Sequence, residues 1–201
     1  MKTKGIIVQT ALKLFLSKGF NETSMNEIAG EVGISKPAIY HHFKNKDELV
    51  QAIFDHFTVK MANWTQGSYS GLSDKEKIHK MFSSTPTFMH IEDVLLDSID
   101  TDLPYSYNMF MLLMSRMKSE YKIRISEDLL LTHQKLTESF IRLQQEQNIR
   151  DDIEPETLSR MMHSILEGLS FLGELTECAD VETESESLYQ AFWKMIQKEN
   201  H

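Results

Sequence analysis

The sequence contains one cysteine, four prolines and no long apolar run. The single cysteine, Cys178, excludes an intrachain disulfide and favours a reducing compartment, the cytoplasm. No stretch approaches the roughly 18 apolar residues that a membrane-spanning helix needs, so we expect no membrane partner. Glycine is absent between Gly71 and Gly168, and no segment alternates apolar and polar residues long enough to form a sheet. These absences predict an all-α protein.

Charge is distributed unevenly along the chain. The net charge of the whole is −9, but residues 1–60 carry a net charge of +2 and residues 61–201 a net charge of −11. A mildly basic segment can approach phosphates, whereas the acidic remainder favours solubility and repels non-specific DNA. The two parts are therefore expected to face different partners.

Helical periodicity runs through nearly the whole chain. Helices are expected over residues 3–18, from Ser24 to the stop at Gly33, and over about 36–43 and 46–64. A linker is expected at 66–71, followed by helices near 74–89, 91–101, 106–121, 124–148, 155–177 and 183–198.

The two helices on either side of Gly33 form the most informative pattern. Ser24 and Glu27 have the spacing of a capping box at the start of the first helix. Gly33 allows the left-handed conformation of a tight turn, Ser35 caps the second helix, and Pro37 lies in its first turn. This arrangement predicts a helix-turn-helix whose second helix enters the major groove of duplex DNA.

Residues 6–54 resemble the head of the TetR family of transcriptional regulators, whereas the rest of the chain resembles that family only in layout. The resemblance is carried by A-x-x-L-F at 11–15, Gly19-Phe20 with Thr23, I-A at 28–29, V-G-I-S at 32–35, Tyr40-x-His42-Phe43 and Lys46-Asp47-Glu48-Leu49.

The resemblance implies two sets of DNA contacts. Phosphate contacts are implied for Tyr40, His42, Lys46 and the cap at Thr23 or Ser24, and base contacts for Lys36, Pro37, Ala38 and His41. The physical chemistry of these residues agrees: a lysine can donate to guanine, and an alanine methyl can touch a thymine methyl. Tyr40 has an alternative interpretation as a half-buried packing residue. Pro37 and His41 differ from the residues most frequent in the family, which leaves the operator sequence open.

Segments 155–177 and 183–198 are expected to form a homodimer interface, as the resemblance also implies. The first has two apolar stripes, one with Met161, Gly168, Phe171 and Leu175, and the sequence does not decide which faces a partner chain. Four such helices from two chains would make an isologous bundle. The alternative is that both helices are central in one monomer core. The expected interface residues are Leu158, Met162, Ile165, Leu169, Leu172, Leu188, Phe192 and Met195.

The middle of the chain is rich in methionine and aromatic residues, which suit an adaptable apolar pocket and also fill ordinary cores. The expected effector-binding residues are Phe88, Met109, Phe110, Met114, Met117, His163 and Glu167.

Together these patterns predict a non-enzymatic, dimeric repressor that a small apolar or amphipathic ligand releases from a pseudo-palindromic operator. Residues 1–48 would bind DNA, 49–201 would bind the ligand and dimerise, and the helix at about 46–64 would connect them. No nucleophile elbow, phosphate-binding glycine loop or metal-binding spacing is present, so no cofactor, metal or catalytic residue is expected. A DNA binder without a ligand, a protein-partnered DNA binder and a ligand-dependent activator remain alternatives.

Overall fold

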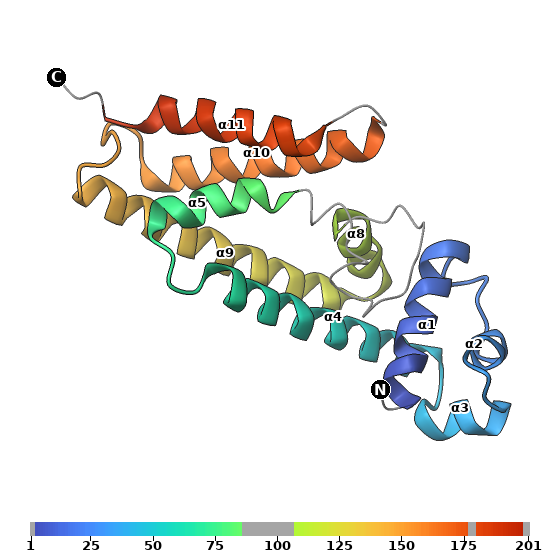
Figure 1. Cartoon of the computed structure of the whole chain (residues 1–201). Coiled ribbons are helices and arrows are strands. Elements are labelled where there is room, and N and C mark those ends of the chain that lie inside the picture. Colours follow the sequence, from blue (N-terminus) through green and yellow to red (C-terminus); the bar gives the residue numbers. More distant parts are fainter. Residues whose placement is uncertain (1–2, 86–106, 177–179, 199–201) are drawn as a thin grey trace. The chain divides into compact units, whose positions relative to one another are not determined.

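The computed structural model describes residues 3–85, 107–176 and 180–198, which contain nine helices and one isolated β-bridge (Figure 1). The all-α prediction is confirmed. The described residues form two compact units, residues 3–65 and residues 66–198 with the gaps just given. None of the described helices combines the length and the apolar content needed to cross a bilayer. The expected helix at 91–101 lies outside the described residues.

The first unit comprises α1 (Thr3–Lys18), α2 (Met25–Val32), α3 (Lys36–His42) and the first part of α4 (Lys46–Tyr69). Most of α1 is buried, and α2 contacts both α1 and α3. Apolar residues at helical spacing point inward: Ile7, Ala11, Leu14 and Phe15 in α1 and Met25, Ile28 and Ala29 in α2 are all buried.

The turn between α1 and α2 depends on Thr23 and Ser24. The Thr23 hydroxyl lies 2.9 Å from the Gly19 carbonyl oxygen and 3.3 Å from the Leu14 carbonyl oxygen, and its side chain is buried. The Ser24 hydroxyl accepts a hydrogen bond from the Glu27 amide at 3.2 Å, which forms the first half of the expected capping box. The Glu27 carboxylate pairs with the Lys18 ammonium, so this side chain joins α2 to the end of α1.

Helix α4 is longer than expected. The sequence predicts its end at about residue 64 and a linker over 66–71, but the helix continues to Tyr69, and the break comes at Gly71, whose φ is +75°. Tyr69 explains the extension because this residue is half-buried in the fold. Burial raises the pKa of its phenol to about 12, and a hydrogen bond with Ser84 opposes this shift. Tertiary packing therefore outweighs the helix cost of Gly67.

The second unit contains α5 (Asp74–Ser83), α8 (Tyr107–Met117), α9 (Ser119–Gln145), α10 (Pro155–Leu175) and α11 (Val181–Ile196). Helix α9 contacts α5, α8 and α10, and α11 contacts α5 and α10. Helix α5 ends six residues before the expected residue 89. The break between α8 and α9 falls at Lys118 rather than after residue 121. The predicted helices of the second unit are thus confirmed within the described residues, but their ends differ from the predicted positions.

An apolar cluster holds α5, α9, α10 and α11 together. Phe82, Phe140 and Phe192 form its aromatic centre, with ring centroids 5.8 Å apart for Phe82–Phe192 and 6.2 Å apart for Phe140–Phe192. An antiparallel bridge between Ile149 and Gln197 then fastens the α9–α10 connection to the end of α11.

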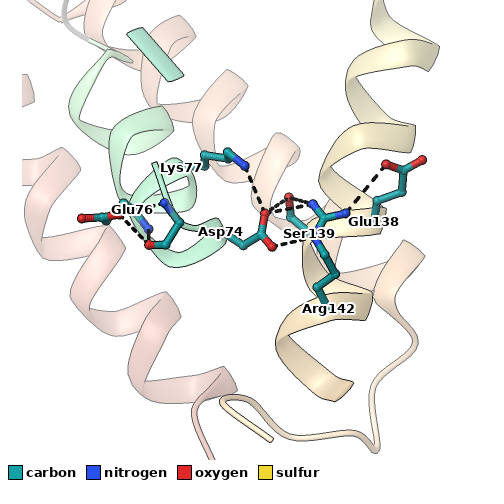
Figure 2. A network of polar contacts seen from close by, with 7 residues as sticks. Asp74, Glu76, Lys77, Glu138, Ser139 and Arg142 are labelled. Carbon is teal, nitrogen blue, oxygen red and sulfur yellow. Dashed lines mark hydrogen bonds and ion pairs between the residues drawn. The ribbon is translucent and has the colours of Figure 1, made fainter. Parts of the chain in front are cut away.

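A polar network joins the start of α5 to the last turns of α9 (Figure 2). The Asp74 carboxylate accepts hydrogen bonds from Arg142, from the Ser139 hydroxyl at 2.9 Å and from Lys77 at 3.4 Å. Ser73 and Glu76 complete a capping box at the same end of α5. The network therefore fixes both the start of α5 and its contact with α9.

Candidate nucleic-acid interface

The orientation of α3 is set by the turn that precedes it. Gly33 has a φ of +76°, and the Ile34 amide donates to the Ala29 carbonyl oxygen at 2.9 Å. Ser35 then caps α3 by accepting a hydrogen bond from the Ala38 amide at 3.3 Å. The geometry is that of a helix-turn-helix, in which α3 occupies the position of the recognition helix.

One face of α3 anchors the helix and the opposite face is open. Ile39 is fully buried, as is Phe43 just beyond the helix. On the open side lie Lys36, Pro37, Tyr40 and His41, which are exposed, and Ala38 and His42, which are half-buried. The Tyr40 ring is 42% exposed, so this tyrosine can reach a ligand outside the chain. The structure thus gathers six of the sequence-predicted DNA contacts on one short helix.

The two cap residues before α2 differ in accessibility. Thr23 is only 1% exposed and its hydroxyl faces carbonyl oxygens inside the chain, which removes this side chain from the accessible surface. Ser24 is exposed, and its hydroxyl can donate outward while it accepts from the Glu27 amide. Ser24 is therefore the cap residue that remains available to a phosphate.

Lys46, at the start of α4, was expected to contact a phosphate, but its ammonium points into the first unit. Its ammonium donates to the carbonyl oxygens of Phe20 and Thr23, the second at 2.8 Å, and lies 4.0 Å from the centroid of the Phe20 ring. Both contacts are internal to the first unit. The predicted phosphate donor is thus already engaged with the α1–α2 turn.

A second lysine, Lys4, lies near the end of α3. The Lys4 ammonium lies 5.1 Å from the centroid of the Phe43 ring, and the Lys4 side chain is exposed. This places a positive charge at the end of α3. The basic start of the chain was visible in the sequence, but only the fold brings residues 4 and 43 together.

The predicted effector residues are spread over two helices of the second unit. Phe110 and Met114 of α8 are buried, and Met117 is half-buried. On α10, His163 Nε2 lies 3.1 Å from a Glu167 carboxylate oxygen, so the nitrogen donates to the carboxylate. Phe88 and the side chain of Met109 lie outside the described residues.

A pocket of about 500 Å³ opens elsewhere in the second unit, between the start of α5 and the ends of α9 and α11. None of the predicted effector residues lines it; its walls are Ser73, Asp74, Lys75, Leu143, Glu146, Gln147, Asn148, Trp193, Gln197 and Lys198.

The predicted dimer residues divide into two groups. Leu158, Met162, Leu169 and Phe192 are at most 5% exposed within the single chain and pack into its own core, so they offer no surface to a partner. Ile165 is half-buried against the same core. Exposed apolar side chains on α10 and α11 are Phe171, Leu172, Leu175, Leu188 and Met195. Phe171 and Leu175 of one stripe and Leu172 of the other are thus exposed near the end of α10, whereas Met161 packs against the core.

Comparison with known proteins agrees with this geometry. Residues 7–53 match the family model described as bacterial regulatory proteins, tetR family. YvaF of Bacillus subtilis, named as an uncharacterized HTH-type transcriptional regulator, is 31% identical over 123 residues, which is 60% of this chain and 62% of that protein. The alignment therefore spans less than two thirds of the length of this relative. YuxN of the same organism is 46% identical over 52 residues, 26% of this chain and 18% of YuxN.

The fold as a whole is also shared with solved structures. A TetR transcriptional regulator from Chloroflexus aurantiacus aligns with a TM-score of 0.76 over 98% of both chains, at 16% sequence identity. Residues 7–53 thus match the tetR family model, and the chain shares the all-helical fold of a solved TetR transcriptional regulator.

Proposed function

We propose that this protein is a dimeric transcriptional repressor that binds a pseudo-palindromic DNA operator and is released by a small apolar or amphipathic ligand. The observation that carries the proposal is the open face of α3. Lys36, Tyr40 and His41 are exposed there while Ile39 holds the helix from behind. DNA binding would place the protein in the cytoplasm, where its operator lies.

Residues 1–48 would perform the DNA binding. Lys36 can donate to guanine or to a phosphate, the Ala38 methyl can contact thymine, and Tyr40 and Ser24 can donate to phosphates. A helix of this length enters one major groove and reads one half-site, so two copies are needed for an operator.

Residues 49–201 would form the dimer interface and the ligand site. Phe171, Leu172 and Leu175 recur at helical spacing on α10 and are 56%, 58% and 66% exposed. A Cβ atom added to Gly168, on the same face, would meet nothing within 4 Å, so a partner helix could approach closely there. These features support an isologous interface built from α10 and α11.

The effector is proposed to bind among α8, α9 and α10: α9 contacts both other helices, and Asn108 of α8 donates to the Ser170 hydroxyl of α10 at 3.2 Å. Helix α8 carries four methionines and a phenylalanine, side chains that adapt to apolar ligands. His163 and Glu167 are the polar groups that could orient such a ligand. The ligand would release DNA if it binds a second conformation better by a few kcal/mol.

The test measures, by fluorescence anisotropy, how tightly the purified protein binds the promoter DNA upstream of its own gene. Tyr40→Ala should weaken binding about tenfold or more, the loss expected for one good contact of about 1.4 kcal/mol. Asn63→Ala, an exposed position of α4, is the matched control and should bind like the wild type. Equal binding by all three proteins would exclude α3 as the DNA reader.

The same complex then serves for the effector screen. Titration with apolar and amphipathic compounds should dissociate it in a dose-dependent way. A compound that instead tightens the complex would identify an activator or co-repressor mode, and the absence of any response would favour a ligand-independent DNA binder.

A further inference from the structure

Lys46 begins α4 directly after the turn that closes the helix-turn-helix. The positive end of the helix dipole repels a lysine ammonium in the first turn of a helix, so the ammonium is more stable when it points away from that turn. Here it turns to the segment between α1 and α2, where it donates to the Phe20 and Thr23 carbonyl oxygens.

Aromatic rings complete the surroundings of this ammonium. The Lys46 nitrogen lies 4.0 Å from the Phe20 ring centroid and 5.8 Å from the Phe15 ring centroid, distances at which a cation is attracted to a ring face. Two carbonyl oxygens and two rings therefore stabilise the charge inside the first unit. Two of the three ammonium donors are thus engaged inside the first unit, and turning the ammonium fully towards a phosphate would leave these carbonyl groups without this donor.

Lys44 differs from Lys46 in its exposure and in the contacts of its ammonium. It lies two residues earlier, its side chain is exposed, and within the part of the chain that the structure describes its ammonium makes no hydrogen bond or ion pair. Only its backbone amide is engaged, by donating to the Glu48 carboxylate at 2.8 Å. Lys44 thus carries a charge that is free to meet a phosphate.

We propose that Lys46 is a positioning residue, which fastens the first turn of α4 to the turn before α2, and that Lys44 supplies the phosphate contact. This inference rests on the proposed DNA binding. Its structural consequence is that the start of α2 and the start of α4 move together, because one ammonium is bonded to Thr23, next to the Ser24 cap of α2.

The salt dependence of DNA binding distinguishes the two roles. Each lost phosphate contact lowers the slope of log K against log salt by about 0.9 in magnitude. Lys44→Met should lower the slope by about this amount. Lys46→Met should weaken binding at every salt concentration and leave the slope unchanged. A slope that falls with Lys46→Met, or one that stays the same with Lys44→Met, overturns the proposal.

Two measurements on the free protein keep the inference separate from the proposed function. Hydrogen–deuterium exchange of residues 19–24 should accelerate in Lys46→Met and remain as in the wild type in Lys44→Met. The second measurement uses only the wild-type protein and so does not depend on the folding of a variant. The protein is acetylated with an N-hydroxysuccinimide ester, and the modified lysines are identified by mass spectrometry. The ester should modify Lys44 quickly and Lys46 slowly. Equal exchange in both variants, or equal acetylation rates, contradicts the internal role of Lys46 whether or not the protein binds DNA.

Discussion

Arg142 of α9 binds Asp74 of α5 through two parallel hydrogen bonds, from Nε to Oδ2 at 2.7 Å and from Nη2 to Oδ1 at 2.9 Å (Figure 2). The Asp74 side chain is 13% exposed and the Arg142 side chain 45%. Such a bidentate pair is stronger than an ordinary surface ion pair, and it connects residues 68 positions apart.

Asp74 should therefore make the stability of the protein depend on acidity. The hydrogen bonds from Arg142 hold the pKa of the Asp74 carboxyl at about 2, below its ordinary value of 3.8, against an opposing effect of burial. Because the folded carboxyl has the lower pKa, its contribution is present above about pH 4 and is lost as the pH falls towards 2.

Asp74→Asn should lower the free energy of unfolding at pH 7 by about 1–2 kcal/mol, a figure reduced for the solvent exposure of Arg142. Urea unfolding at several pH values measures this, and the difference from the wild type should shrink towards pH 2. Glu138→Gln is the control, because Glu138 lies 3.9 Å from Arg142 and is 65% exposed. If Asp74→Asn lowers the free energy of unfolding equally at every pH, the charge of Asp74 does not contribute and the prediction is wrong.

Gly30 and Gly33 form a matched pair that tests the helix-turn-helix turn. A Cβ atom added to either would meet nothing within 4 Å, but only Gly33 has a left-handed φ, of +76°. Gly33→Ala should cost about 1–2 kcal/mol of stability. Gly30→Ala, within α2, should raise stability by about 0.5–1 kcal/mol. Thermal unfolding compares them, and a destabilised Gly30→Ala would show that space rather than backbone conformation limits this turn.

The turn chemistry of the first unit could be predicted because it is local. Ser24, Gly33, Ser35 and Pro37 act on amides or dihedral angles within a few residues, and α2 and α3 begin and end within one residue of the expected positions. The direction of the Lys46 side chain could not be predicted in this way. It depends on carbonyl groups 23 and 26 residues earlier, which only the fold brings near.

The two apolar stripes of α10 show a second limit. Both have helical spacing, and hydrophobicity alone does not say which stripe meets the chain's own core. The structure buries Leu158 and Met162 against Phe140 and Phe192 and leaves Leu175 exposed. The correct choice depends on where α9 and α11 lie, which is tertiary information.

Leu175 and Leu130 test whether the exposed face of α10 is the dimer interface. They are 66% and 63% exposed, on α10 and α9 respectively. Leu175→Glu should convert the proposed dimer to a monomer, because a charge would be buried without a partner in the interface. Leu130→Glu should remain a dimer. Sedimentation velocity reads both, and a dimer that persists in Leu175→Glu but not in Leu130→Glu would move the interface to α9.

His133 of α9 and His163 of α10 stack, with ring centroids 4.6 Å apart and ring planes inclined by 29°. His133 Nδ1 lies 3.2 Å from the Ser159 hydroxyl oxygen, which itself lies 3.3 Å from the His133 carbonyl oxygen and donates to it. We assign a donating N–H to Nδ1 from this network. Burial lowers the pKa of His133 below its ordinary 6.5, and the positive charges of His163 and Arg160 lower it further, whereas Glu156 opposes them.

The contact between α9 and α10 should therefore weaken on acidification. Since the folded imidazole has the lower pKa, the unfolded chain takes up this proton first, and stability falls as the pH drops below about 6.5. His133→Gln, which keeps a hydrogen-bond donor for Ser159, should make the unfolding free energy less dependent on pH between 7.5 and 5.5, a range of about two units around that value. Gln134→Ala, an exposed neighbour on α9, should leave that dependence as in the wild type. If His133→Gln retains the full loss of stability on acidification, another group carries the titration and the stacked pair is only a packing contact.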